Sequence, residues 1–137
     1  MLSRLVNLLR AGPLDVPYQG ASFRFYHQAS ATERGALFNP DYNLEELDFL
    51  RAHSRKGGVF VDVGANVGTY ALALARHVGE SGKVIAIEPH PVTHARLKFN
   101  REASGATQVT LVAAAAGPCL LYTSPSPRNR TRSRMPY

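Results

Sequence analysis

The chain has 137 residues, 45% of them hydrophobic, and its 16 Lys and Arg outnumber 10 Asp and Glu, which gives a formal net charge of +6. This length leaves room for one domain at most. A single cysteine, Cys119, excludes an internal disulfide and a cysteine metal cluster. Up to residue 118 there are 12 basic and 10 acidic side chains, so most of the net positive charge, +4 of +6, lies in the C-terminal tail. Nucleic-acid binding would depend on that tail alone, and we expect no nucleic-acid partner.

The first ten residues resemble a signal peptide only superficially. Asn7 and Arg10 interrupt their apolar positions and no long apolar core follows, so a short amphipathic helix is the better interpretation. No run approaches the ~20 apolar residues that a membrane span requires. We therefore expect a soluble, cytoplasmic protein with no membrane partner.

Residues 1–57 are expected to form an N-terminal lead-in segment of helices and a short strand. Gly12-Pro13 and Pro17 are expected to break the first helix. The alternation of apolar and polar residues over 22–26 predicts the strand.

The second half of this segment predicts a turn and a further helix. The turn falls at residues 39–41, and apolar residues at helical spacing predict a helix from Asn43. Glu45 and Glu46 stand near the start of this helix, where acids are favourable. We interpret them as helix-start charges rather than as ligands.

Residues 58–118 alternate between β and α patterns, which is typical of an α/β fold with a parallel sheet and right-handed crossovers. The first strand is nearly continuous in apolar residues, as expected of a strand that is covered on both faces. The sheet would stop after about three strands, so this domain is expected to be incomplete. The predicted strands are 59–63, 84–88 and 109–112. The predicted helices are 69–78 and one that begins at Pro89 and Pro91 and runs to about Ala103.

The turn after the first of these strands carries the clearest functional signal. It reads Asp-x-Gly-x-Asn-x-Gly, with Asp62, Gly64, Asn66 and Gly68 at the named positions. Glycine accepts positive φ and allows a ligand close to the backbone. Glu88 follows 24 residues after Gly64, at the end of the next strand. This is roughly the spacing (~20 residues) at which an acid binds a ribose hydroxyl, so the pattern predicts a pocket for an adenosine-bearing cofactor.

The turn departs from a dinucleotide-binding pattern. Asn66 stands where the second glycine of Gly-x-Gly-x-x-Gly would fall, and no Gly-Lys-[Ser/Thr] follows. A diphosphate needs bare backbone N–H groups at a helix N-terminus. An asparagine in that space and an acid upstream suit a cofactor without phosphate and with a cationic amino-acid end. Asn66 itself could either cap the following helix or face a ligand.

Three segments together resemble the FkbM family of S-adenosylmethionine-dependent methyltransferases. They are the residues 59–70, the string Val-Ile-Ala-Ile-Glu-Pro-His-Pro at 84–91, and Leu-Lys-Phe-Asn at 97–100. Residues 23–26 and 42–47 are also similar to the segment that precedes the core in that family, so the resemblance covers roughly 20–117.

The resemblance implies a Rossmann-like class I methyltransferase fold that binds S-adenosylmethionine. Gly64 and Gly68 would let the turn approach the methionine part of the cofactor, and Asp62 would face its ammonium group. Glu88 would accept hydrogen bonds from both ribose hydroxyls. The backbone of residues 113–116 would approach the adenine. The cofactor-binding residues are thus expected to be Asp62, Val63, Gly64, Asn66, Gly68 and Glu88.

The reaction that the resemblance implies is methyl transfer to a hydroxyl oxygen of a small molecule or a glycan. Such an acceptor benefits from a general base, but the chain offers no candidate, and no catalytic residue is assigned. Two alternatives stay open: an NAD- or other nucleotide-binding α/β protein, and a fragment without activity by itself.

Two further patterns carry weaker signals. His90 and His94 have metal-ligand spacing on one helix face, but no third ligand is evident, and we expect no metal. Residues 119–137 have the composition of a disordered basic tail. Their first ten residues resemble a translated sequencing adapter, so we expect this tail to be non-native and fused to a truncated gene; a genuine disordered tail is the alternative.

Overall fold

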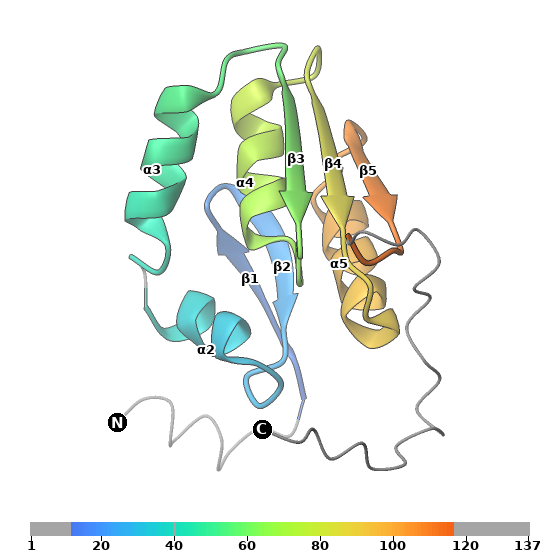
Figure 1. Ribbon diagram of the computed structural model, residues 1–137. Coiled ribbons are helices and arrows are strands. Elements are labelled where there is room, and N and C mark those ends of the chain that lie inside the picture. The colour runs from blue at the N-terminus through green and yellow to red at the C-terminus, as the bar shows by residue number, and fades with distance from the viewer. Residues whose placement is uncertain (1–11, 40, 117–137) are drawn as a thin grey trace, which may run out of the picture.

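The computed structural model describes residues 12–39 and 41–116, which form a hairpin, two helices and a β-α-β-α-β unit in chain order (Figure 1). The helix expected within residues 1–10 and the tail expected from residue 119 lie outside the described residues. None of the helices in the described ranges is long and apolar enough to cross a membrane.

The chain begins with an antiparallel hairpin of β1 (Leu14–Tyr18) and β2 (Ala21–Phe25). Its two loop residues, Gln19 and Gly20, have φ of 49° and 80°, which is the left-handed geometry that two-residue hairpin turns require. The predicted strand is therefore present, whereas strand β1 was not expected from the sequence. The first helix, which Pro17 was expected to break, lies outside the described residues. Pro17 lies within β1, and a proline is tolerated there because β1 is an edge strand.

Two helices follow the hairpin. Helix α2 (Ala31–Phe38) was not expected from the sequence, and Ser30 caps it by accepting a hydrogen bond from the backbone N–H of Glu33. Helix α3 (Leu44–His53) confirms the helix predicted from Asn43, with both Glu45 and Glu46 in its first turn. Both helices lie on the same side of β3 in Figure 1.

The β-α-β-α-β unit confirms the predicted parallel sheet. The strands lie side by side in the order β3-β4-β5, and both neighbouring pairs are parallel. Strand β4 begins and ends one residue earlier than predicted, while β3, α4 and β5 have the predicted bounds. The elements are β3 (Val59–Val63), α4 (Thr69–Val78), β4 (Lys83–Ile87), α5 (Pro91–Ala103) and β5 (Val109–Val112).

Only one face of this sheet is covered within the described residues. Helix α4 packs on it, and the side chains on that face include the buried Val84 and Val109. On the other face Val59, Val61 and Val63 are 68%, 50% and 60% exposed. The expectation that the first strand is covered on both faces is wrong for this part of the chain. The reason is topological: right-handed crossovers that advance in one direction put their helices on the same face.

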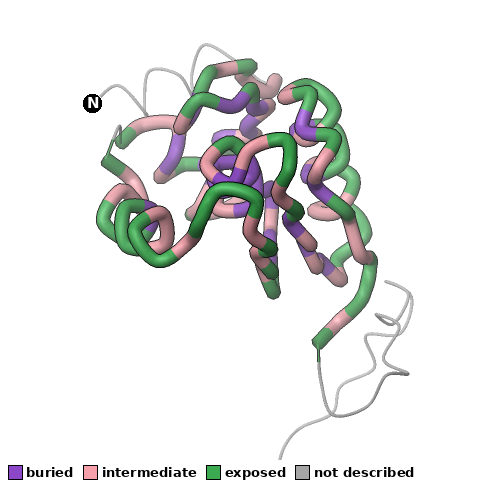
Figure 2. Tube along the Cα trace, turned by 90° about the horizontal axis from the view of Figure 1, so that it is seen from above, coloured by how far each residue is buried: buried purple, intermediate pink, exposed green. Residues whose placement is uncertain are grey.

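The core lies between the covered face of the sheet, the helices and the hairpin. Figure 2 shows the buried residues gathered in this interior. Phe25 is fully buried and its ring stacks on Phe23 at 4.9 Å between centroids. Asn100 of α5 is also fully buried. Its Nδ2 donates to the carbonyl of Val67 at 3.0 Å, and its Oδ1 accepts the backbone N–H of Arg24 at 2.8 Å. A single side chain thus connects the hairpin to the glycine turn.

Candidate functional site

The glycine turn leaves β3 at the end where β4 also finishes. Gly64 has a φ of 80°, and the backbone N–H groups of Gly64 and Ala65 both donate to the carbonyl of Ile87 at 2.9 Å. Gly68 has a φ of 97° and its N–H donates to the carbonyl of Ala65. These bonds hold the turn against the end of β4, so the sequence-predicted residues of the turn and of β4 are brought together.

The two glycines of the turn are required for different reasons. A Cβ at Gly64 would meet no atom within 4 Å, so the space beside this residue is open. A Cβ at Gly68 would lie 2.7 Å from Cδ1 of Leu97 and 3.3 Å from Cγ of Leu72. Gly68 therefore allows α4 and α5 to pack closely, whereas Gly64 leaves room for a ligand against the backbone.

Glu88 directly follows β4 and is only 7% exposed. Its Oε2 accepts the backbone N–H of Asn66 and its Oε1 accepts the backbone N–H of His90, each at 2.9 Å. A carboxylate oxygen has two lone pairs, so each oxygen keeps the capacity to accept one more hydrogen bond. The carboxylate is thus held from both sides and is still able to bind a pair of hydroxyl groups.

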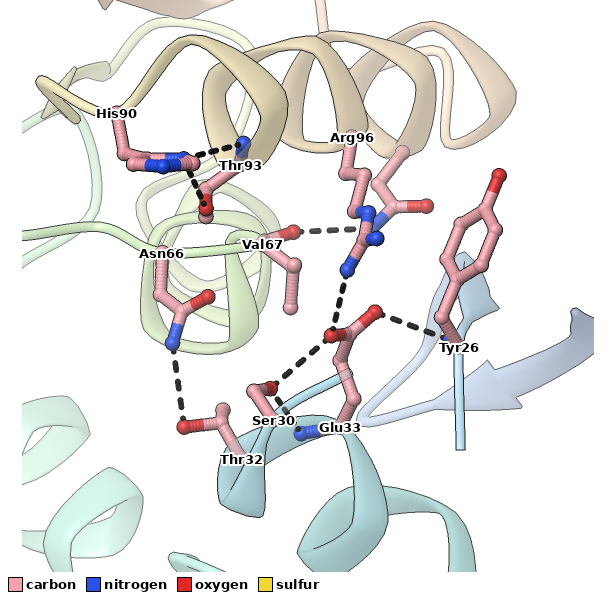
Figure 3. A network of polar contacts seen from close by, with 10 residues as sticks. Tyr26, Ser30, Thr32, Glu33, Asn66, Val67, His90, Thr93 and Arg96 are labelled. Carbon is pink, nitrogen blue, oxygen red and sulfur yellow. Dashed lines mark hydrogen bonds and ion pairs between the residues drawn. The ribbon is translucent and has the colours of Figure 1, made fainter. Parts of the chain in front are cut away.

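Asn66 has a left-handed backbone, with a φ of 50°. Its side-chain Nδ2 donates to Oγ1 of Thr32 on α2 at 3.2 Å (Figure 3). The N-cap of α4 is Gly68, and no side chain caps it. The interpretation of Asn66 as a helix cap is therefore wrong; its side chain instead joins the glycine turn to the N-terminal segment.

Asp62 lies on β3 with its side chain on the covered face of the sheet, next to the first turn of α4. Burial raises its pKa to about 6; the charge of Glu88 also raises this pKa, and a hydrogen bond from the backbone N–H of Ala71 lowers it. Its Oδ2 is buried without a hydrogen-bond partner in the described part of the chain. Val63 ends β3 and its side chain is on the exposed face.

A hollow of about 590 Å³ opens beside Asp62 between α3, β3 and α4. It places Glu45 and Glu46 on the same surface as Asp62, so the acids of α3 lie closer to the candidate site than their sequence position indicates. The lining residues are Glu45, Glu46, Phe49, Leu50, Phe60, Asp62 and Tyr70.

The first turn of α2 contributes polar residues that the sequence analysis missed. Glu33 is 1% exposed, and its carboxylate accepts hydrogen bonds from the backbone N–H of Tyr26 and the hydroxyl of Ser30. It also forms an ion pair with Arg96 of α5 at 3.1 Å (Figure 3). Ser30 and Glu33 have the S-x-x-E spacing of a capping box, and this sequence pattern could have indicated the start of α2.

His90, the N-cap of α5, and His94 in its first turn do not form a metal site with their described neighbours. Nδ1 of His90 accepts the backbone N–H of Thr93 at 3.5 Å, which caps the helix. In residues 12–39 and 41–116 no three His, Cys, Asp or Glu side chains gather in a way that could hold a metal ion.

Comparison with solved structures identifies the class of fold. TYW2 from M. jannaschii, in complex with AdoMet, has a TM-score of 0.60 at 21% identity over 75% of this chain and 43% of its own. A SAM-dependent methyltransferase from Agrobacterium tumefaciens has a TM-score of 0.59 at 15% identity, covering 78% of this chain and 34% of its own. A protein described as an rRNA methylase from Clostridium thermocellum has a TM-score of 0.50 at 22% identity, over 52% and 39%. The fold is the Rossmann-like α/β fold of class I methyltransferases, and the chain spans about two fifths of the length of such structures.

The sequence family is shown by a match over residues 22–109. The chain belongs to the family described as Vibrio cholerae RfbT protein. This is not the FkbM family that the sequence resembles, and the FkbM assignment stays a prediction. No curated protein matches the chain.

Proposed function

We propose that this protein is part of a methyltransferase that uses S-adenosylmethionine as its methyl donor. The observation that carries the proposal is the carboxylate of Glu88, held by the backbone N–H groups of Asn66 and His90 beside the open face of Gly64. Fixed acceptors next to a glycine turn at the carboxyl ends of parallel strands suit the ribose of an adenosine. The class I methyltransferase fold supports the same cofactor.

Each part of the cofactor has a candidate partner. Glu88 would accept the two ribose hydroxyls with the lone pairs that its backbone bonds leave free. The open space at Gly64 would receive the methionine part, and the buried, unpartnered Oδ2 of Asp62 would accept its ammonium group, directly or through water. Val63 and the backbone of residues 113–116, which follow β5, would complete the pocket. Gly68 would not contact the cofactor; it would contribute indirectly, because it sets the direction in which α4 leaves the turn.

The alternative, an NAD-binding protein, is less compatible with the turn. A diphosphate is bound by free backbone N–H groups. Here the N–H groups of Gly64, Ala65, Asn66 and Gly68 already donate to protein oxygens. Binding a diphosphate at this turn would require breaking those bonds, whereas a cofactor without phosphate does not need them.

The acceptor class is the finer part of the proposal. The FkbM resemblance favours a hydroxyl oxygen on a small molecule or a glycan as the methyl acceptor. One similar fold belongs to a protein described as an rRNA methylase, so RNA is a competing acceptor. The charge of only +2 over the first 118 residues argues against RNA, because strong phosphate contacts need a basic surface.

The described chain supplies the cofactor half of such an enzyme. No residue of the described part is assigned as a general base. Within the same residues one face of the sheet is exposed, and neither β3 nor β5 has an outer partner strand. We therefore propose that the chain is a fragment which binds cofactor and has no turnover by itself. An uninterrupted reading frame across residue 119 in an independently sequenced locus would contradict the part of this proposal that makes the tail non-native.

A binding titration tests the cofactor assignment. S-adenosylhomocysteine and NAD would each be titrated into the 137-residue chain by isothermal calorimetry. We expect binding of S-adenosylhomocysteine and none of NAD. Tight NAD binding without S-adenosylhomocysteine binding would overturn the proposal, and the absence of turnover would not.

A further inference from the structure

We infer that Thr32 of α2 is a positioning residue for the cofactor turn, and that it acts through Asn66 on the carboxylate of Glu88. This inference rests on the proposed function and adds to it a residue from the N-terminal segment. Thr32 belongs to an element that the sequence analysis did not predict, and it lies 34 residues before Asn66 in the chain.

The three residues form a continuous chain of hydrogen bonds. Oγ1 of Thr32 accepts from Nδ2 of Asn66 at 3.2 Å, and the backbone N–H of Asn66 donates to Oε2 of Glu88 at 2.9 Å. Both bonds depend on the conformation of one residue, Asn66. Its side chain and its backbone are therefore set together, and the orientation of the Glu88 carboxylate follows.

Asn66 needs such support because of its backbone conformation. Its φ of 50° is in the left-handed region, which L-residues other than glycine adopt at a cost. Asparagine tolerates this region better than most residues because its short polar side chain can form a local hydrogen bond. Here that hydrogen bond runs to Thr32 instead, so the turn's strained position is fixed by a contact from outside the sheet.

Thr32 is itself held in place by the anchoring of α2. Next to it, Glu33 is buried and bonded to Ser30, to the backbone of Tyr26 and to Arg96 of α5 (Figure 3). A buried carboxylate with these partners has little freedom to move, since breaking any of them leaves a desolvated polar group. The first turn of α2 is thus a rigid support, joined to α5 through Glu33 and to the glycine turn through Thr32.

The test uses two substitutions that separate shape from hydrogen bonding. Thr32→Val keeps the branched shape and removes the hydroxyl, while Thr32→Ser keeps the hydroxyl. We expect Thr32→Val to weaken S-adenosylhomocysteine binding about threefold to tenfold, the value of one net hydrogen bond, and Thr32→Ser to bind nearly as the parent does. Loss of the hydroxyl group in Thr32→Val should also speed hydrogen exchange of the Asn66 backbone amide, measured by NMR without ligand. Thr107→Val, an exposed Thr-to-Val change in the loop between α5 and β5, is the control and should alter neither value.

A double-mutant cycle decides whether Thr32 acts through Asn66. Asn66→Gly accepts the same φ and removes the side chain, so Thr32→Val should have no further effect in that background. An equal loss of affinity in both backgrounds, or unchanged affinity and unchanged amide exchange in Thr32→Val, would overturn the inference. If the parent chain binds no S-adenosylhomocysteine, the proposed function fails. Amide exchange then decides the inference alone: acceleration by Thr32→Val supports the positioning of the turn, and no change overturns it.

Discussion

The carboxylate of Glu88 and the backbone N–H of Asn66 are joined by a hydrogen bond of 2.9 Å, so the end of β4 and the turn after β3 form one unit. The same carboxylate also accepts the N–H of His90, the N-cap of α5. One buried acid therefore holds together the glycine turn, the end of β4 and the start of α5.

Replacing Glu88 with glutamine should weaken cofactor binding strongly. Glutamine keeps one acceptor oxygen and puts an NH₂ group where the other oxygen accepted a backbone N–H. Hydrogen bonds to a charged group contribute about 1.5–3 kcal/mol, so S-adenosylhomocysteine affinity is expected to fall by at least about tenfold. Glu102→Gln, an exposed position on α5, is the matched control. Equal affinity of the Glu88→Gln variant and the parent in calorimetry would remove Glu88 from the site.

Asp62 should make stability depend on pH in a defined window. Its pKa of about 6 lies above the usual aspartate value of 3.8, so the folded state prefers the protonated acid. The stability that this preference contributes is fully present below about pH 4 and is lost as the pH rises through about 6. Asp62→Asn, which cannot ionise, should therefore gain stability relative to the parent across that window, by about 1–3 kcal/mol. Urea denaturation at several pH values measures this, and a constant difference between the two proteins would contradict it.

Asp62 should also couple cofactor binding to pH. If its carboxylate accepts the ammonium group of the cofactor, bound ligand favours the ionised acid. The affinity for S-adenosylhomocysteine should then increase between pH 5 and pH 7 in the parent and should stay flat in Asp62→Asn. A rise of the same size in both proteins would assign the pH dependence to another group.

The two glycines of the turn should respond differently to alanine. In Gly68→Ala the new Cβ would lie 2.7 Å from Leu97, at a φ of 97°, so we expect a loss of about 2–4 kcal/mol in the free energy of unfolding. In Gly64→Ala the Cβ meets no atom within 4 Å, and only the φ of 80° costs about 1 kcal/mol. Cofactor affinity should nevertheless fall in Gly64→Ala because the methyl group would enter the proposed ligand space. Thermal unfolding and calorimetry together distinguish the two; similar losses of stability would contradict the assignment.

Asn100→Leu should destabilise the fold without touching the proposed cofactor. The change leaves the carbonyl of Val67 and the N–H of Arg24 buried or half-buried without their partner. Unsatisfied buried groups cost about 1–3 kcal/mol each, so the free energy of unfolding should fall by about 2–4 kcal/mol. Denaturant unfolding measures this, and a loss below about 0.5 kcal/mol would show that both groups find other partners.

Much of the β-α-β-α-β unit could be predicted because its local signals agree. Continuous apolar runs, a glycine turn and an Ala/Leu-rich helix give β3 and α4 with their correct bounds. The N-terminal segment was predicted less well. Strand β1 was not predicted, because a proline is rare inside strands; Pro17 is tolerated there since β1 pairs on one side only. Helix α2 has only eight residues, and its Ser30–Glu33 capping signature was not recognised.

The candidate site likewise contains residues that the sequence predicted and one residue that it did not. Asp62, Gly64, Asn66 and Glu88 were predicted because they belong to one motif with a fixed spacing, and the structure brings them to the same end of the sheet. Thr32 could not be predicted, because its contact with Asn66 depends on how the hairpin and α2 pack on α5. The exposure of the β3 face also could not be predicted, since an apolar run does not tell on which side of a sheet the next helix lies.

The exposed valines of β3 have a consequence for how the chain behaves during and after its synthesis. Val59, Val61 and Val63 form an exposed apolar row on a strand whose outer edge has no partner strand in residues 12–39 and 41–116. Such a row is the kind of surface that chaperones bind and that neighbouring nascent chains can pair with. Association through this row would then limit how much protein accumulates, independently of how well the glycine turn holds its cofactor.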